Sequence, residues 1–240
     1  VIVENHYEAR PQSGLEEAFL VYEAPVEAGI TRMLAFYSVE QEVEEIGPVR
    51  SARPYFVDWV KMFDALFAHV GGSPQALEQI KEDGTFDLNE YWYGGVYFWR
   101  SDSRAAPHNV YTSTDLLKEA QEELGGLEFE YESWVFKDSE YTSKEQVGIA
   151  IDFSIYDWNN AEWIFDENIG RYERYDQEWV HQTVSGESIY ADNVVVIETD
   201  ILLIDEIGRR SIEVLGSGNA YLVQDGRVVE CEWQKETASD

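Results

Sequence analysis

Two arginines flank the expected start of a helix, where backbone N–H groups without a partner favour anions. The helix is predicted to begin near Ser51, between Arg50 and Arg53. Pro54 suits its first turn because no N–H is needed there. A guanidinium group binds a carboxylate or phosphate through two parallel hydrogen bonds. Arg50, Ser51 and Arg53 are therefore candidate ligands for an anion.

A second helix start follows closely along the chain. A short apolar run that includes His69 predicts a strand, and Gly72 lies in the turn after it. Ser73 and Pro74 have the residue types of an N-cap and of a first helical position. We therefore add His69, Gly72 and Ser73 to the candidate ligand-binding residues. The alternative is that the glycines form only a tight turn and the arginines pair with nearby carboxylates.

The remaining candidates lie in an expected strand and in a loop. Arg32 belongs to a mostly apolar segment, residues 30–38, that predicts a strand. Arg104, His108 and Asn109 belong to a loop that is rich in hydrogen-bond donors. Together with Arg50 and Arg53, Arg32 and Arg104 would form the positive lining of an anion site.

Acid–base catalysis is the alternative use of these residues. His108 would act as acid or base, assisted by Glu23 or Glu27, in a hydrolase or transferase. The sequence contains no nucleophile elbow, phosphate-binding loop, dinucleotide fingerprint or zinc motif. His6 and His181 show no metal-ligand spacing. We therefore expect no cofactor and no transition metal, favour a protein that is not an enzyme, and leave open an oxygen-ligated calcium ion.

The net charge excludes several classes of partner. The 48 acidic and 17 basic side chains give a formal net charge of −31. Residues 1–113 carry 18 acids and 8 bases, a net −10, and residues 114–240 carry 30 acids and 9 bases, a net −21. Nucleic acids and anionic membrane surfaces are poor partners for such a chain. The less acidic first part is where an anion could bind.

An aromatic segment lies between the second helix and the donor-rich loop. Residues 91–99, YWYGGVYFW, contain six aromatic side chains around a glycine pair. Aromatic faces bind sugars and flat ligands, because stacking on them costs little conformational entropy. The structural alternative is a hairpin or bulge that feeds the core. In the first case these side chains would flank the anion site.

The periodicity of the apolar residues changes along the chain. The first part alternates strands with helices, including helices from near Ser51 and over residues 75–81, which indicates an α/β layer. The later part repeats apolar residues with period 2, which indicates antiparallel strands. We therefore predict an α+β protein, with an α/β-type domain over residues 1–140 and a mostly antiparallel, β-rich domain over residues 141–240.

The cysteine content excludes a disulfide within the chain. Cys231 is the single cysteine, so a thiolate metal cluster is also excluded. In the expected strand around it, Cys231 shares a face with Val229 and Trp233. We expect an inert, buried thiol.

Seven sequence blocks spread over nearly the whole chain carry a family resemblance. In chain order they are ENHYEARPQSGL, LVYEAPVEAGITRMLAFYS, GPVRSARPYFVDW, AHVGGSPQAL, RSDSRAAPHNVYTS, RYERYD and DNVVV. These blocks resemble the YerB-like lipoproteins, a bacterial family built on a domain of unknown function. The resemblance implies the same two domains and an extracytoplasmic, membrane-anchored location, with a lipid-modified cysteine before Val1. The resemblance implies no activity. The extreme acidity of this chain departs from the family and argues against a partner that is itself a polyanion.

These observations lead to three hypotheses. The first is a noncatalytic envelope protein that binds an anionic group of an envelope glycan or peptide through Arg32, Arg50, Arg53 and Arg104. The second is an enzyme that acts on an envelope polymer. The third is a scaffold that contacts another envelope protein through the β-rich part. In each, nucleic acid is excluded and the membrane is reached only through the lipid anchor.

Overall fold

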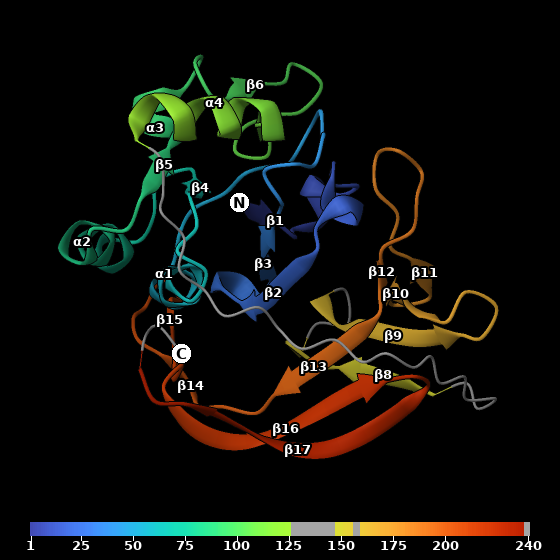
Figure 1. The fold of residues 1–240 in the computed structure, drawn as a ribbon. Coiled ribbons are helices and arrows are strands. Elements are labelled where there is room, and N and C mark those ends of the chain that lie inside the picture. The colour runs from blue at the N-terminus through green and yellow to red at the C-terminus, as the bar shows by residue number, and fades with distance from the viewer. Residues whose placement is uncertain (126–146, 156–158, 238–240) are drawn as a thin grey trace.

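The N-terminal part is built on a three-stranded antiparallel sheet. The computed structural model describes residues 1–125, 147–155 and 159–237 (Figure 1). The sheet order is β1-β3-β2, and all six residues of the central strand β3 are buried. Its elements and the short 3-10 helices between them are β1 Ile2–Glu4, η1 Tyr7–Ala9, η2 Leu15–Glu17, β2 Leu20–Pro25, η3 Glu27–Gly29 and β3 Thr31–Phe36.

A short parallel pair of strands with helices follows. Its first three elements have the predicted order of helix, strand and helix, whereas its last strand and last helix were not predicted. The elements are α1 Pro54–Lys61, β4 Phe67–His69, α2 Pro74–Asp83, β5 Asp87–Asn89 and α3 Glu90–Tyr93. The start of α1 near Ser51 was predicted too early. Residues 50–52 are extended instead, because Arg50 and Ala52 form backbone hydrogen bonds with Ile2 and Gly71. A proline also disfavours helical backbone angles in the residue before it, here Arg53, so the helix begins at Pro54.

The end of this part holds a small hairpin and a longer helix. Their bounds are β6 Trp99–Arg100, β7 Val110–Tyr111 and α4 Thr114–Leu124. The α4 side chains Leu116, Leu117 and Ala120 pack on the cluster that contains Val110 and Val49. This packing holds α4 and β7 against the N-terminal sheet.

The C-terminal part is β-rich and antiparallel throughout its described strands. The strands are β8 Gly148–Ile151, β9 Ala161–Asp166, β10 Arg171–Asp176, β11 Trp179–Val180, β12 Tyr190–Ala191, β13 Asn193–Ile197, β14 Ile201–Leu203, β15 Arg210–Ile212, β16 Gly216–Gln224 and β17 Arg227–Lys235. β13, β16 and β17 form a long curved ribbon, and β14–β15 returns toward α1 (Figure 1). The chain is therefore α+β with a β-rich C-terminal part, as predicted. The predicted boundary at residue 140 lies outside the described residues. So do residues 129–131, where alternating apolar side chains predict a strand.

The buried core lies mainly in the N-terminal part. Two apolar clusters centred there contain 16 and 14 of the described buried side chains, of which Ile189 and Ile212 come from the C-terminal part. Among the described residues, the cluster between β9, β10, β13 and β16 contains four, namely Phe165, Tyr172, Val194 and Val223. None of the described helices is long and apolar enough to span a bilayer.

The burial predicted for Cys231 is wrong. Its thiol is exposed on β17, and Val229 on the same face is half exposed. Period 2 correctly gave the strand, but it could not show whether another layer covers that face.

Candidate functional site

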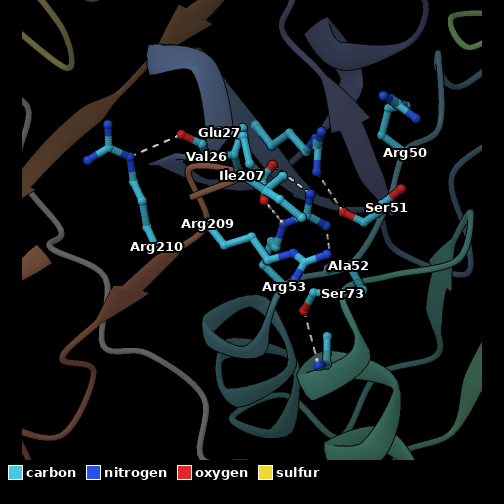
Figure 2. Close-up of polar contacts among 12 residues, drawn as sticks. Val26, Glu27, Arg50, Ser51, Ala52, Arg53, Ser73, Ile207, Arg209 and Arg210 are labelled. Carbon is cyan, nitrogen blue, oxygen red and sulfur yellow. Dashed lines mark hydrogen bonds and ion pairs between the residues drawn. The ribbon is translucent and has the colours of Figure 1, made fainter. Parts of the chain in front are cut away.

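The two helix starts predicted from the sequence lie side by side. Val70 N donates to Arg50 O at 3.0 Å, and Ala52 N donates to Gly71 O at 3.0 Å. The two segments thus run in parallel and lead directly into α1 and α2, an arrangement in which α/β proteins often place ligands. The predicted N-cap is confirmed, because Ser73 Oγ accepts a hydrogen bond from Ala76 N at 3.2 Å (Figure 2).

At the start of α1 each of the three nitrogens in the guanidinium group of Arg53 donates to an internal acceptor. Its Nε and Nη2 atoms donate to the two oxygens of Glu27 at 2.7 and 2.6 Å, and Nη1 donates to Ala52 O at 2.7 Å (Figure 2). Burial raises the pKa of Glu27, but the hydrogen bonds and charge of Arg53 outweigh burial and hold that pKa below its ordinary value. A ligand anion at Arg53 would therefore have to displace an ionised carboxylate.

Two other candidate arginines share one buried carboxylate. Arg50 Nε donates to Glu4 Oε2 at 2.8 Å, and Arg32 Nη2 donates to the same oxygen at 3.3 Å. Arg32 Nη1 also donates to the backbone oxygen of Ser51 at 3.1 Å. Burial raises the pKa of Glu4, and the two arginines more than reverse this, so its pKa lies below the ordinary value. These contacts fix β1, β3 and the extended segment before α1 to one another.

Arg104 binds backbone oxygens. It donates to the carbonyls of Glu8 at 3.0 Å, Arg10 at 3.4 Å and Pro11 at 2.5 Å. Its side chain thereby fastens the loop between β6 and β7 to the loop after β1. The candidate arginines are thus distributed over three separate groups of acceptors, and Arg50 stands apart from Arg53 in Figure 2. This geometry favours a structural role for Arg32 and Arg53.

His69 and Gly72 have structural surroundings as well. The buried His69 ring places Nδ1 2.7 Å from Gly71 O and Nε2 3.2 Å from Asp87 Oδ2. A Cβ atom at Gly72 would lie 3.3 Å from the Ala52 side chain, so glycine permits the close approach of the two segments. Both residues hold the parallel strands and their turns in place.

The two candidate catalytic glutamates do not meet His108. Glu27 is paired with Arg53, and Glu23 lies in a buried network that sequence reasoning missed. In that network Arg174 donates to Glu23 Oε2 at 2.8 Å and to His181 Nδ1 at 2.9 Å. The network also includes Asn5, Gln12, Thr31, Asp176 and Arg10. The sequence RYERYD signalled a strand but gave no sign that Arg174 crosses to β2.

His108 meets a different pair of residues. Its ring stacks on His6 with centroids 5.1 Å apart, and Nε2 lies 3.7 Å from Glu8 Oε2. Burial of the ring is the main reason that the pKa of His108 lies below its ordinary value, although the Glu4 carboxylate opposes the shift. The neutral ring is therefore favoured, with a nitrogen lone pair available to a proton or another electrophile.

The aromatic segment forms neither a simple hairpin nor a single flat platform. Tyr97 and Phe98 enter the core, whereas Tyr91 and Trp92, on α3, are 66% and 80% exposed. A hollow of ≈ 630 Å³ is lined by Glu90, Tyr91, Trp92, Gly94, Gly95, Phe98, Trp99 and Arg100. The hollow is open to solvent, and its lining combines aromatic rings with an arginine and a glutamate.

Polar groups converge on one wall of this hollow. Arg100 Nη2 donates to Glu90 Oε1 at 2.8 Å, and Nη1 donates to Asn109 Oδ1 at 3.1 Å. The Arg100 side chain is 48% exposed. Asn109 was predicted as a ligand residue. In the structure it accepts a hydrogen bond from Arg100 and is not part of the lining of the hollow. Arg100 and Glu90 were not predicted, although the aromatic run between them was the signal that marked this region.

Comparison with known proteins gives the family. The "Protein of unknown function (DUF3048) N-terminal domain" matches residues 1–127, and the corresponding C-terminal domain matches residues 149–240. The chain belongs to this family. It is 36% identical over 239 residues to "Putative lipoprotein YerB" of Bacillus subtilis (strain 168), covering 98% of this chain and 72% of that protein.

A solved structure in the DUF3048 family has the same fold. The crystal structure of the YerB protein from Bacillus subtilis matches with a TM-score of 0.86 at 33% identity, over 100% of this chain and 81% of that chain. The family resemblance read from the seven sequence blocks is therefore confirmed. The family descriptions name no activity, so function has to be argued from the site.

Proposed function

We propose that this chain is the extracytoplasmic part of a membrane-anchored envelope lipoprotein and that it binds an envelope glycan, without catalysis, in the aromatic hollow. The name of its Bacillus subtilis relative supports the location. The hollow beside α3 supports the ligand class. Its carboxylate and guanidinium groups can bind hydroxyl and acetamido groups, and its aromatic faces can stack on sugar rings.

The observation that carries this proposal is the exposure of Trp92 and Tyr91 within a concave surface. An exposed indole and phenol ring leave apolar area in water, and a ligand that covers them recovers the hydrophobic free energy. A glycan segment with an isolated carboxylate fits better than a dense polyanion. Arg100 can bind one carboxylate, whereas the net charge of −31 repels a polymer of them.

Calorimetric titration with two soluble oligosaccharides tests the proposal. One probe is a neutral N-acetylglucosamine oligomer, and the other is a cell-wall glycan fragment of the same length that carries lactyl carboxylates. We expect Trp92→Ala to weaken both by roughly five- to tenfold, about 1–1.4 kcal/mol of stacking. Arg100→Ala should weaken the second by roughly tenfold or more, because a charge-assisted hydrogen bond to the lactyl carboxylate is lost, and should weaken the neutral probe much less.

The chain offers a matched control for the tryptophan variant. Trp179 on β11 is 76% exposed and lies outside the hollow, so Trp179→Ala should leave both affinities unchanged. Equal loss with Trp92→Ala and Trp179→Ala, or no binding of either probe by the wild-type chain, would overturn the proposal.

The other two hypotheses have less support. An enzyme based on His108 lacks Glu23 and Glu27, which are engaged elsewhere. A scaffold role would be sought at β14, where Leu202 and Leu203 are exposed, and it stays a prediction.

A further inference from the structure

Two histidines and a glutamate from separate parts of the chain meet at one surface. His6 Nδ1 lies 3.8 Å from Glu8 Oε2, and His108 Nε2 lies 3.7 Å from the same oxygen. The three possible ligand atoms all lie within 4.8 Å of one another. In a tetrahedral zinc site, ligand atoms about 2.0–2.2 Å from the ion are about 3.3–3.5 Å apart. The two distances to Glu8 Oε2 therefore need to close by only a few tenths of an ångström, and a turn of the His6 ring has to bring the two ring nitrogens to the same spacing.

The loops that carry these side chains are held together independently of them. His6 is the N-cap of η1 and Glu8 lies within it. Arg104 binds the backbone oxygens of Glu8, Arg10 and Pro11, which brings the loop containing His108 onto η1. His108 N also donates to Ala105 O at 3.0 Å, which shapes that loop. The meeting of the three residues is therefore a property of the backbone arrangement.

The histidines of this chain differ in how their rings are used. Both ring nitrogens of His69 and of His181 lie within hydrogen-bond distance of protein partners. Among the contacts of the described residues, His108 Nδ1 is buried without a hydrogen-bond partner, and Nε2 has only the 3.7 Å approach to Glu8. Core or cross-linking roles thus account for two of the four rings, and the N-cap bond of η1 uses one nitrogen of His6. None of the described hydrogen bonds accounts for the His108 ring.

We infer that His6, Glu8 and His108 form a binding site for a divalent first-row transition metal ion, with zinc as the expected occupant. Two imidazoles and one carboxylate are a donor set that zinc uses when a fourth position stays open to water or another ligand. Imidazole donors favour zinc, copper and nickel over calcium and magnesium, which prefer oxygen ligands. The sequence gave no sign of this site, because residues 6 and 108 meet only in the folded chain.

Binding requires one local movement. The two rings are stacked nearly parallel, at 6°, and an ion cannot lie in the plane of both. The His6 side chain is 25% exposed, so its ring can turn about the Cβ–Cγ bond toward the shared oxygen of Glu8. This turn gives up one hydrogen bond, in which His6 Nδ1 accepts from Glu8 N at 3.2 Å. The ion replaces it with coordination bonds.

Metal titration of the whole chain, freed of metal with a chelator and without a histidine tag, tests this inference. The probes are Zn²⁺ by equilibrium dialysis with elemental analysis, and Co²⁺ by its visible absorption, which reports coordination geometry and ligand type. We expect one equivalent of Zn²⁺ to bind, and His6→Ala, His108→Ala and Glu8→Gln each to weaken binding at least tenfold.

The control replaces a comparable carboxylate elsewhere. Glu17 is exposed and lies in the 3-10 helix η2, so Glu17→Gln should leave Zn²⁺ affinity unchanged. If His108→Ala fails to fold, His6→Ala still decides the question, because His6 lies at the more exposed edge of the cluster. The inference fails if the wild-type chain retains no stoichiometric Zn²⁺. It also fails if the His6 and Glu8 variants bind as tightly as the wild type.

Discussion

Two regions of this protein use the same chemical groups in opposite ways. In the network between β2 and β10, Arg174 contacts Glu23 at 2.8 Å and its side chain is 1% exposed. In the wall of the aromatic hollow, Arg100 contacts Glu90 at 2.8 Å and its side chain is 48% exposed. Equal distances thus accompany very different surroundings. Burial, rather than the presence of an arginine and a carboxylate, separates a structural cross-link from a surface that a ligand can reach.

The buried network joins the parts that the two DUF3048 domain descriptions cover. Asn5, Gln12 and Glu23 come from the N-terminal part, and Arg174 and His181 come from the C-terminal part. Removing one partner from such a network leaves an uncompensated buried charge, which costs far more than the loss of an exposed ion pair. Variants of the two kinds of arginine therefore test the comparison directly.

The largest effect is expected from Arg174→Met. The substitution leaves Glu23 without its buried cation and removes one of the two arginines that contact Asp176, so the free energy of unfolding should fall by about 3–5 kcal/mol. Urea unfolding at neutral pH measures it. Arg171→Met on the same strand is the control, because its pair with Asp192 is exposed and should contribute no more than about 1 kcal/mol. Similar losses in the two variants would contradict the distinction drawn from burial.

Arg53→Ala should act on stability and leave ligand binding unchanged. It removes two charge-assisted hydrogen bonds to Glu27, so we expect a loss of about 2–3 kcal/mol in unfolding free energy. Arg53→Lys should recover only part of this, because an ammonium group cannot form the same two-pronged contact. Glycan titration of the same variants completes the test. A weaker affinity at unchanged stability would place the anion site at the start of α1.

Acid should weaken the buried network between β2 and β10. Burial raises the pKa of Asp176, but its contacts with His181, Arg174 and Arg10 outweigh burial and lower that pKa to about 2. Because the folded-state pKa is depressed from an unfolded value near 3.9, the stabilisation is present above about pH 4 and is lost as the pH falls toward 2. The expected loss is about 2 kcal/mol.

Urea unfolding as a function of pH measures this loss. In Asp176→Asn the part of the decline that belongs to Asp176 should disappear, so the curve between about pH 4 and 2 should flatten. An unchanged slope in this variant would assign the acid sensitivity to other carboxylates.

The smallest effect is expected from salt. Repulsion among exposed carboxylates is screened within roughly 10 Å at about 0.1 M salt, so the melting temperature should rise by a few degrees between low and molar salt. Arg100→Ala removes a half-exposed ion pair, so the small decrease in unfolding free energy that it causes should shrink as salt is added. The decrease caused by Arg174→Met should stay nearly constant, because salt screens a buried pair poorly. A flat melting temperature would mean that the acidic side chains are already balanced locally.

Local pattern was enough to determine much of the fold. Ser73 and Pro74 fixed the start of α2 because capping depends on backbone N–H groups within one turn. Period 2 identified β9, β10, β13 and β17, because alternation of side chains follows from the strand backbone itself. Composition alone gave the acidic character.

Only the tertiary structure decided which side chains meet. His6 and His108, Arg174 and Glu23, and the exposed face of Cys231 depend on strand order and on how distant loops pack. The arginines chosen from the sequence had the right chemistry for an anion, yet whether a guanidinium faces Glu27 or solvent is set by elements far along the chain. Backbone patterns act over a few residues. The partners of a side chain and its burial arise from contacts across the whole fold. The hollow and the histidine pair were therefore found in the tertiary structure and not in the sequence.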